Sequence, residues 1–127
     1  EGGTADLRDN RRNWRSAVAD AAADALADQL DGRQMDGPLS LDVVFRAPMP
    51  ASRPKWMRAL GCWWKPTAPD LDKLVRSVGD SLTASGLIKD DARIVALRAM
   101  KIEVDGWTGA TISVHEIGNE PADEVIW

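Results

Sequence analysis

The feature that most constrains the fold is a segment whose apolar residues recur at the spacing of an α-helix. The residues of this stripe are Leu71, Leu74, Val75, Val78 and Leu82. They predict an amphipathic helix over residues 70–84, which should end near Gly86 because glycine is a favoured residue at helix C-termini. Two segments with the alternating pattern of strands follow, at 94–104 and 110–117, with the turn signal Asp105-Gly106 between them.

The first third of the chain predicts one more helix and one more strand. Residues 5–30 are rich in Ala, Leu, Asp and Arg, with apolar residues at helical spacing, so an amphipathic helix is expected there. Gly32 and Gly37 end it, and the apolar, partly β-branched residues 39–46 predict a strand. Residues 1–127 are therefore expected to form a single α+β domain, in which two main α-helices pack on a small mixed β-sheet.

Length and composition limit the class of protein. A chain of 127 residues buries one compact core and is too short for two ordinary domains. The only cysteine, Cys62, cannot form an internal disulfide, and the sequence holds neither a signal-peptide pattern nor an apolar run of about 18 residues. A soluble protein in a reducing, intracellular setting is the expectation.

Basic residues are concentrated in one part of an acidic chain. The net charge is −4, yet residues 46–76 carry seven basic residues against two acidic ones, a local net charge of +5. The overall charge argues against bulk coating of nucleic acid. A local cluster of Lys and Arg favours contact with phosphates, because these residues displace condensed counterions. An ordinary solvated loop explains the charges equally well.

Residues 47–69 combine prolines, tryptophans and cations. Five of the seven prolines and three of the six tryptophans lie there, and a proline-interrupted loop of this length is usually functional or disordered. Trp56, Trp63 and Trp64 could stack on unpaired bases while neighbouring cations hold phosphates. Alternatively, the rings could pin the loop to the core or to a partner subunit. The sequence alone favours neither interpretation.

Two short runs of aspartates are the strongest candidate for a chemical site. They are Asp70-Leu71-Asp72 at the start of the expected helix and Asp90-Asp91 after it. Mg²⁺ prefers carboxylate oxygens and is commonly held by one or two protein carboxylates together with water and phosphate oxygens. An extended segment from Gly86 to Asp91 is long enough to return to the helix start. The same acids also fit a helix cap and an ordinary acidic turn.

The acidic runs belong to a longer pattern. It comprises Pro69-Asp70-Leu71-Asp72-Lys73-Leu74, then Asp80-Ser81-Leu82, then Gly86-Leu87-Ile88-Lys89-Asp90-Asp91-Ala92-Arg93-Ile94-Val95, and finally Lys101. Over about residues 65–104 it resembles the signature of the RusA family of Holliday-junction resolvases. That signature runs as Pro-Asp-x-Asp-Asn-Leu, a helix carrying Lys and then Asp-x-Leu, an Asp-Asp turn, and a strand ending near Lys. Several spaced matches of this kind are more specific than a single Asp-x-Asp.

The resemblance implies an activity and a set of site residues. It implies a cytoplasmic, homodimeric, Mg²⁺-dependent endonuclease of bacterial or phage origin, with Mn²⁺ as an alternative ion. Such an enzyme resolves four-way DNA junctions by symmetric paired nicks in recombination or repair. The metal-binding acids match Asp70, Asp72 and Asp91, with Asp90 beside them, and Arg76 matches a catalytic lysine. The expected DNA-contacting cations are Arg53, Lys55, Arg58, Lys65, Lys73, Arg76 and Lys101.

Three departures from the family pattern leave other functions open. Lys73 replaces an asparagine and Arg76 replaces a lysine, and a planar guanidinium is not equivalent to a compact ammonium. The chain also begins almost at its first expected helix, so the first strand of the family is expected to be absent. A catalytically weakened or inactive branched-DNA-binding protein of the same fold is the alternative. A protein-interaction module whose acids are only helix caps is the third hypothesis.

Overall fold

The computed structural model describes residues 2–8, 20, 23–24 and 32–118. The strands are β1 (Gly2–Arg8), β2 (Leu39–Pro48), β3 (Cys62–Trp64), β4 (Ile94–Val104) and β5 (Gly109–Glu116). The helices with described bounds are α2 (Lys55–Ala59), α3 (Leu71–Ala84) and the short 3-10 helix η1 (Asp91–Arg93). In this described part of the chain no helix has the length and apolar character needed to span a bilayer.

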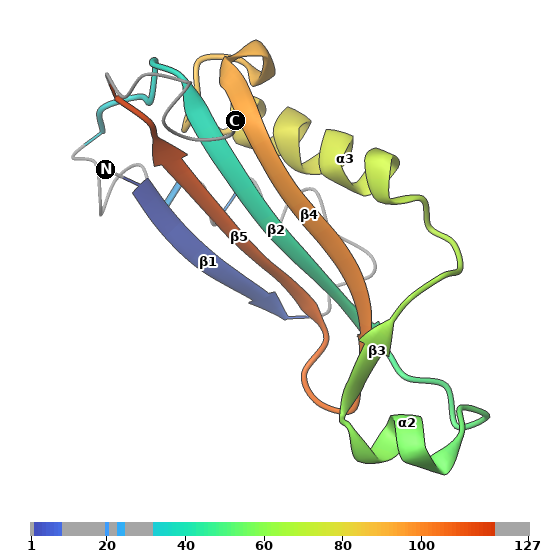
Figure 1. The fold of residues 1–127 in the computed structure, drawn as a ribbon. Helices are drawn as coiled ribbons and strands as arrows, with labels where there is room; N and C mark the ends of the chain where they lie inside the picture. The colour runs from blue at the N-terminus through green and yellow to red at the C-terminus, as the bar shows by residue number, and fades with distance from the viewer. Residues whose placement is uncertain (1, 9–19, 21–22, 25–31, 119–127) are drawn as a thin grey trace.

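The strands form one mixed sheet in the order β1-β5-β2-β4-β3. Only the pair β2 and β4 is parallel, and the other three pairs are antiparallel. Parallel neighbours cannot be joined by a tight turn, so the chain needs a crossover connection, which contains α3. Figure 1 shows α3 running beside β4, while α2 and β3 project from the far end of that strand.

The hydrophobic core joins α3 to one face of the sheet. Every second residue of β2 from Leu39 to Phe45 is buried, and Asp42 between them is exposed, as strand alternation requires. The other buried apolar residues are Met35, Val78, Leu82, Leu87, Ile88, Ala110, Ile112 and Val114. Full burial of one large side chain of this kind contributes about 1.5–3 kcal/mol. The apolar stripe of α3 therefore fixes the helix on the sheet.

The predicted fold class is confirmed, as are most of its elements. The chain forms an α+β domain with a mixed sheet, and the strand predicted at 94–104 has these bounds as β4. The predicted helix at 70–84 is α3, with Asp70 as its N-cap. The strands predicted at 39–46 and 110–117 are β2 and β5 with small shifts of their ends.

The segment predicted as a long loop contains α2 and β3, with five and three residues. Elements this short show no periodic pattern, so their formation depends on contacts with the rest of the chain. For β3 that contact is pairing with the end of β4, from Cys62 opposite Val104 to Trp64 opposite Ile102.

The prediction that a helix begins near Ala5, without a strand before it, is wrong. Residues 2–8 form β1, which pairs with β5 from Gly2 opposite His115 to Arg8 opposite Gly109. Backbone pairing along a sheet edge here overrides the weak helical preference of a short Ala- and Leu-containing segment. Of the remaining predicted helix, Asp20, Ala23 and Asp24 are helical, and the rest lies outside the described residues.

Candidate active site

An open groove of about 360 Å³ runs between α3, η1 and the start of β4. Its lining residues are Asp72, Val75, Arg76, Gly79, Asp91, Ile94, Val95, Ala96 and Leu97. Three of them, Asp72, Arg76 and Asp91, are charged, and their side chains form no hydrogen bond or ion pair with another described residue. The groove thus presents two carboxylates and a guanidinium to a ligand.

Helical periodicity and one glycine bring these residues to the same groove. Asp72, Arg76 and Gly79 are four and three residues apart and share one face of α3. A Cβ built on Gly79 would lie 3.5 Å from the Cβ of Asp91, an ordinary contact distance that leaves little room for a larger side chain. Asp91 therefore enters the groove level with Gly79, about 10 Å along the helix from Asp72 at 1.5 Å per residue.

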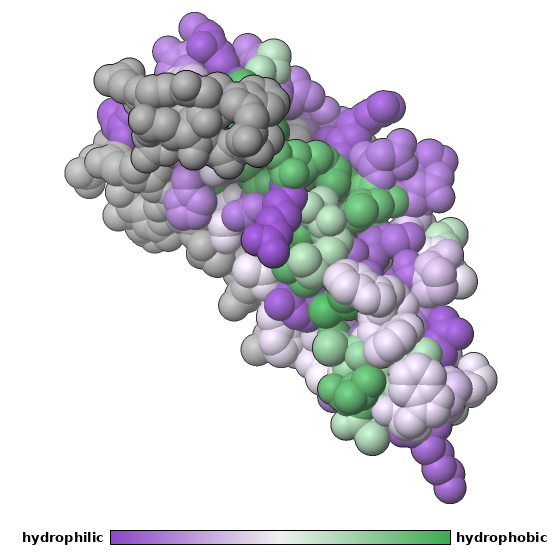
Figure 2. Space-filling view, viewed as in Figure 1, coloured by the Kyte–Doolittle hydropathy of each residue, from purple (hydrophilic) through white to green (hydrophobic). Residues whose placement is uncertain are grey.

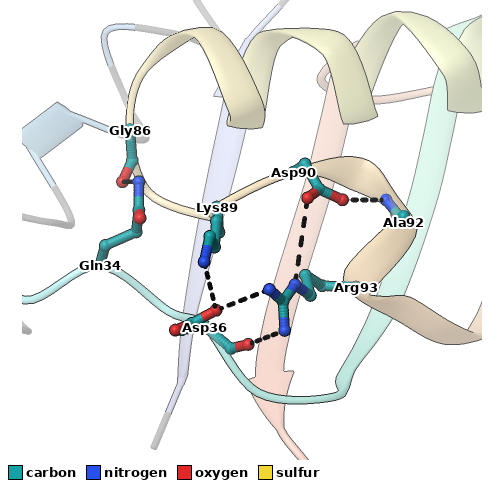
Figure 3. A network of polar contacts seen from close by, with 7 residues as sticks. All are labelled: Gln34, Asp36, Gly86, Lys89, Asp90, Ala92 and Arg93. Atoms are coloured by element: carbon teal, nitrogen blue, oxygen red, sulfur yellow. Dashed lines mark hydrogen bonds and ion pairs between the residues drawn. The ribbon is translucent and has the colours of Figure 1, made fainter.

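Asp90 holds the turn that presents Asp91. Its Oδ1 accepts a hydrogen bond from the amide of Ala92 at 2.8 Å, which caps η1. Its Oδ2 lies 4.0 Å from Nε of Arg93. Figure 3 shows Asp90 turned toward these two residues. Asp90 does not line the groove, so its structural effect is to position the neighbouring carboxylate.

Contacts with the segment before β2 fix this turn from the other side. The amide of Met35 donates to the carbonyl of Leu87 at 2.8 Å, and the amide of Lys89 donates to the carbonyl of Met35 at 3.0 Å. The Asp36 carboxylate lies 3.1 Å from Arg93 and 3.8 Å from Lys89, between the two cations as Figure 3 shows. Exposed ion pairs contribute little individually, so the backbone bonds matter most.

Asp70 lies at the start of α3 but outside the groove lining. It occupies the N-cap position without a side-chain capping bond, and its carboxylate lies 3.5 Å from Nζ of Lys73. Both side chains are well exposed. The lysine that replaces the asparagine of the family pattern therefore pairs with one of the predicted metal ligands.

Two of the predicted DNA-contacting lysines hold the segment that leads into α3. The ammonium of Lys101 donates to the carbonyls of Thr67 at 2.7 Å and Pro69 at 2.8 Å. Lys65 donates its amide to the carbonyl of Lys101 at 3.1 Å and its Nζ to the Thr67 hydroxyl at 2.9 Å. These bonds fix the chain just ahead of Asp70.

The aspartates predicted to bind a metal ion are not gathered into one cluster. Among the residues that the structure describes, no three His, Cys, Asp or Glu side chains are placed to hold an ion together. Asp72 and Asp91 share the groove, whereas Asp70 and Asp90 do not line it. Carboxylates are the donors that a hard divalent cation prefers, and Mg²⁺ commonly takes only one or two ligands from the protein. The donors in the groove therefore fit such an ion in kind, and one ion can bind both carboxylates only if the side chains of Asp72 and Asp91 approach each other along the groove.

Among the described residues, the closest ion pair lies away from the groove, at the base of the α2–β3 projection. Glu103 on β4 is completely buried, and Arg53 donates to its two oxygens through Nε and Nη2, each at 2.8 Å. These hydrogen bonds hold the pKa of the Glu103 carboxyl below its ordinary value, although burial opposes them, and they raise the pKa of Arg53. Arg53 is thus engaged in anchoring the projection and is the least available of the predicted DNA-contacting cations.

The remaining predicted cations are accessible. Lys55 and Arg58 are exposed on α2. Arg58 donates to the carbonyl of Ala51 at 3.1 Å, and Lys55 forms no ion pair with another described residue. A polyanion can therefore reach this side of the molecule.

Two residues of structural consequence, Glu103 and Gly79, were not singled out from the sequence. Glu103 is an acid within an alternating strand, and a charge at a buried strand position requires a partner. Gly79 interrupts a helical pattern at a cost of about 1 kcal/mol relative to alanine. A glycine retained in a helix despite this cost is the sequence feature that could have indicated close packing of another segment at position 79.

Comparison with known families matches residues 1–115 to endodeoxyribonuclease RusA. The match covers most of the chain and includes every residue that lines the groove. No curated protein is similar enough to the chain to count as a match.

Proposed function

Since the chain belongs to the RusA family of endodeoxyribonucleases, we propose that it resolves four-way DNA junctions by metal-dependent, symmetric paired nicks in recombination or repair. The observation that supports the proposal is the groove, where Asp72, Arg76 and Asp91 face one space without partners among the described residues. Phosphodiester hydrolysis requires an activated water and neutralisation of charge on the phosphate. Two carboxylates and a guanidinium can meet both requirements when a divalent ion is bound.

Each charged residue of the groove has a distinct proposed role. Asp72 and Asp91 would hold the ion once their side chains turn toward each other along the groove, and Asp70 is the third candidate ligand once its contact with Lys73 opens. A bound Mg²⁺ or Mn²⁺ would supply the acidity that activates a water and positive charge beside the phosphate. Arg76 donates to the phosphate oxygens and stabilises the additional negative charge of the transition state.

DNA binding and dimerisation complete the proposal. Lys55, Arg58 and Lys73 are exposed cations that would contact backbone phosphates and so orient a branched DNA. Symmetric nicking of two strands requires two equivalent sites, so a homodimer supplies one groove for each strand.

A second candidate function is branched-DNA binding without cleavage. It is favoured by the placement of Asp70 outside the groove, paired with Lys73, and by the guanidinium at position 76. The two candidates are separated by the double variant Lys73→Asn with Arg76→Lys, which restores the family pattern. A wild-type protein that binds junctions but gains cleavage only in the double variant supports the binding function.

The proposed function is tested on a labelled four-way junction and a linear duplex of matched sequence, with Mg²⁺, Mn²⁺ or EDTA and denaturing electrophoresis of each strand. Light scattering coupled to size-exclusion chromatography gives the mass of the protein in the same buffer. Paired, metal-dependent nicks confined to the junction, made by a dimer, are expected. Equal cleavage of the linear duplex would contradict junction selectivity, and nicks in EDTA would contradict metal dependence.

A further inference from the structure

The α2–β3 projection exposes large apolar side chains at the end of the molecule. We call the three rings of this region, Trp56, Trp63 and Trp64, the aromatic tip, and Leu60 lies on the same projection outside it. The exposed fractions of the rings are 58%, 37% and 61%, and that of Leu60 is 60%, which sets all four apart from the buried core. Figure 2 shows pale and green atoms gathered over this projection, with hydrophilic groups at its margin. Large apolar side chains exposed together in one region commonly mark a binding surface.

Contacts other than those of the rings fix the base of the projection on the sheet. Its base is fixed by the two hydrogen bonds between Arg53 and buried Glu103. The amide of Asp105 also donates to the carbonyl of Gly61 at 2.9 Å, and the pairing of β3 with β4 adds backbone bonds. A segment anchored in this way presents its exposed rings in a fixed arrangement, which lowers the entropic cost of binding.

The rings lie on both sides of a thin projection. Successive residues of a strand point to opposite faces, so Trp63 and Trp64 lie on opposite sides of β3. Trp63 shares the side of its partner Glu103 and contacts Trp56 edge to face, with ring centroids 5.2 Å apart. Trp64 lies opposite Ile102 and makes no ring contact with another described residue. Each side of the projection therefore offers an aromatic face to a planar ligand.

The charge around the aromatic tip identifies the class of ligand. Residues 47–69 contain four basic residues and no acidic residue in a chain whose net charge is −4. One of the four, Arg53, is neutralised by Glu103, and Lys55 and Arg58 stay exposed beside the rings. An acidic or neutral protein surface could cover apolar rings, but exposed rings among unpaired cations suit a ligand that combines flat apolar groups with negative charge. Nucleic acid with unstacked bases has this combination.

We propose that the aromatic tip is a base-stacking wedge that takes up unpaired bases at the branch point of the DNA substrate. The proposal rests on the proposed function for the presence of a branch point and adds a recognition element separate from the groove. Trp64 stacks on a base on one side of the wedge, and the Trp56–Trp63 pair does so on the other. Lys55 and Arg58 contact the adjoining phosphates.

The test measures binding in EDTA, which prevents cleavage, with 2-aminopurine placed at the branch point of a four-way junction or inside a single-stranded oligonucleotide. Stacking of the probe changes its fluorescence, and titration gives the affinity. Trp64→Ala is expected to weaken binding of both DNAs about tenfold and to remove the fluorescence change. Trp64→Phe retains a ring and is expected to preserve most of the affinity and most of the fluorescence change. Trp56→Ala is expected to act in the same direction as Trp64→Ala.

Leu60→Ala is the matched control, because it removes an equally exposed apolar side chain of the same region without removing a ring. It is expected to change affinity less than twofold. Unchanged affinity and fluorescence in Trp64→Ala would overturn the proposal. It would also be overturned if Leu60→Ala and Trp64→Ala both reduced self-association in sedimentation, with base binding unaffected, since the patch would then be a contact between copies of the chain. If the protein did not nick junctions in the presence of a divalent ion, the proposed function would be contradicted. The titration with the single-stranded oligonucleotide would still test base stacking by the aromatic tip.

Discussion

The groove and the aromatic tip lie at opposite ends of β4 and differ in what they leave exposed. The groove lies beside Ile94–Leu97 and exposes charges, whereas the tip pairs with Ile102–Val104 and exposes rings. At the tip the buried carboxylate of Glu103 is matched by two hydrogen bonds from Arg53. The groove carboxylates have no such partner among the described residues. Charge therefore maintains structure at one end and is available to a ligand at the other.

In the proposed function, this difference would place two kinds of DNA contact in two regions of the molecule. The middles of the two segments of β4, 94–97 and 102–104, are about seven residues apart, roughly 23 Å at 3.3 Å per residue. A single DNA branch can span that distance, so a phosphate can lie in the groove while a base meets the tip. Substitutions in the groove should then change the rate of nicking, and substitutions at the tip should change affinity.

The largest effect is expected from Asp91→Asn, which keeps the shape of the side chain and removes its charge. Nicking should fall by about 10²–10³, because the loss of a charged carboxylate weakens binding of the divalent ion that neutralises charge on the phosphate, and junction affinity should stay within about twofold. Single-turnover rates at saturating protein measure the first quantity and gel-shift titration the second. Asp105→Asn, in an exposed turn, is the control and should nick at the wild-type rate. Equal losses in both variants would contradict the assignment of the groove.

Gly79→Leu should reduce nicking about tenfold to a hundredfold by displacing Asp91. A large side chain at position 79 meets the Cβ of Asp91, and overpacking of this kind typically costs about 1–3 kcal/mol of stability. Urea unfolding measures the stability and single-turnover assays the rate. Gly79→Ala is the matched control, because its methyl group makes only ordinary contact at 3.5 Å and should leave the rate within about threefold. A Gly79→Leu protein that is folded and fully active would show that Asp91 need not lie beside α3.

Lys101→Met should lower nicking about tenfold and leave the salt dependence of junction binding unchanged. Lys101 bonds the carbonyls that precede Asp70, so its loss misplaces the start of α3 without removing a phosphate contact. The slope of log affinity against log salt concentration reports the number of phosphate contacts. Lys55→Met should reduce that slope by about one unit and keep the nicking rate at saturation. The opposite pattern would make Lys101 a phosphate ligand.

The smallest expected effect is on the pH dependence of stability, through the Arg53–Glu103 pair that anchors the aromatic tip. The folded-state pKa of Glu103 is depressed, so the stabilisation it provides is complete above its unfolded pKa of about 4.3. It is lost as pH falls through the lower folded-state pKa, because the unfolded chain binds the proton first. Urea unfolding from about pH 7 down to about pH 3 measures the free energy of unfolding. This free energy should fall more steeply with decreasing pH in the wild type than in Arg53→Met. Identical pH profiles would contradict the importance of this pair for anchoring the tip.

Local patterns predicted the elements whose own residues determine them. The stripe from Leu71 to Leu82 and the alternation of β4 were sufficient to place α3 and β4. The strand β1 was missed because its formation depends on β5, which lies about a hundred residues later in the chain. The candidate site divides in the same way. The common face of Asp72 and Arg76 could be predicted, because it follows from helical spacing alone.

The position of Asp91 depends on contacts between distant segments. It follows from the close approach at Gly79 and from the bonds between Met35 and residues 87 and 89. The engagement of Arg53 and Lys101 within the protein likewise depends on partners remote in sequence. Charge and spacing predicted which residues could serve the site, and the tertiary contacts decide which of them face the groove.

Whether the groove is the nuclease site is tested most directly by the single-turnover nicking rate of Asp72→Asn on a four-way junction with Mg²⁺. Asp42→Asn, an exposed aspartate on β2 outside the groove, is measured beside it. Asp72→Asn is expected to lose nicking and still bind the junction, while Asp42→Asn behaves as the wild type. Wild-type nicking by Asp72→Asn would contradict the assignment of the groove as the nuclease site.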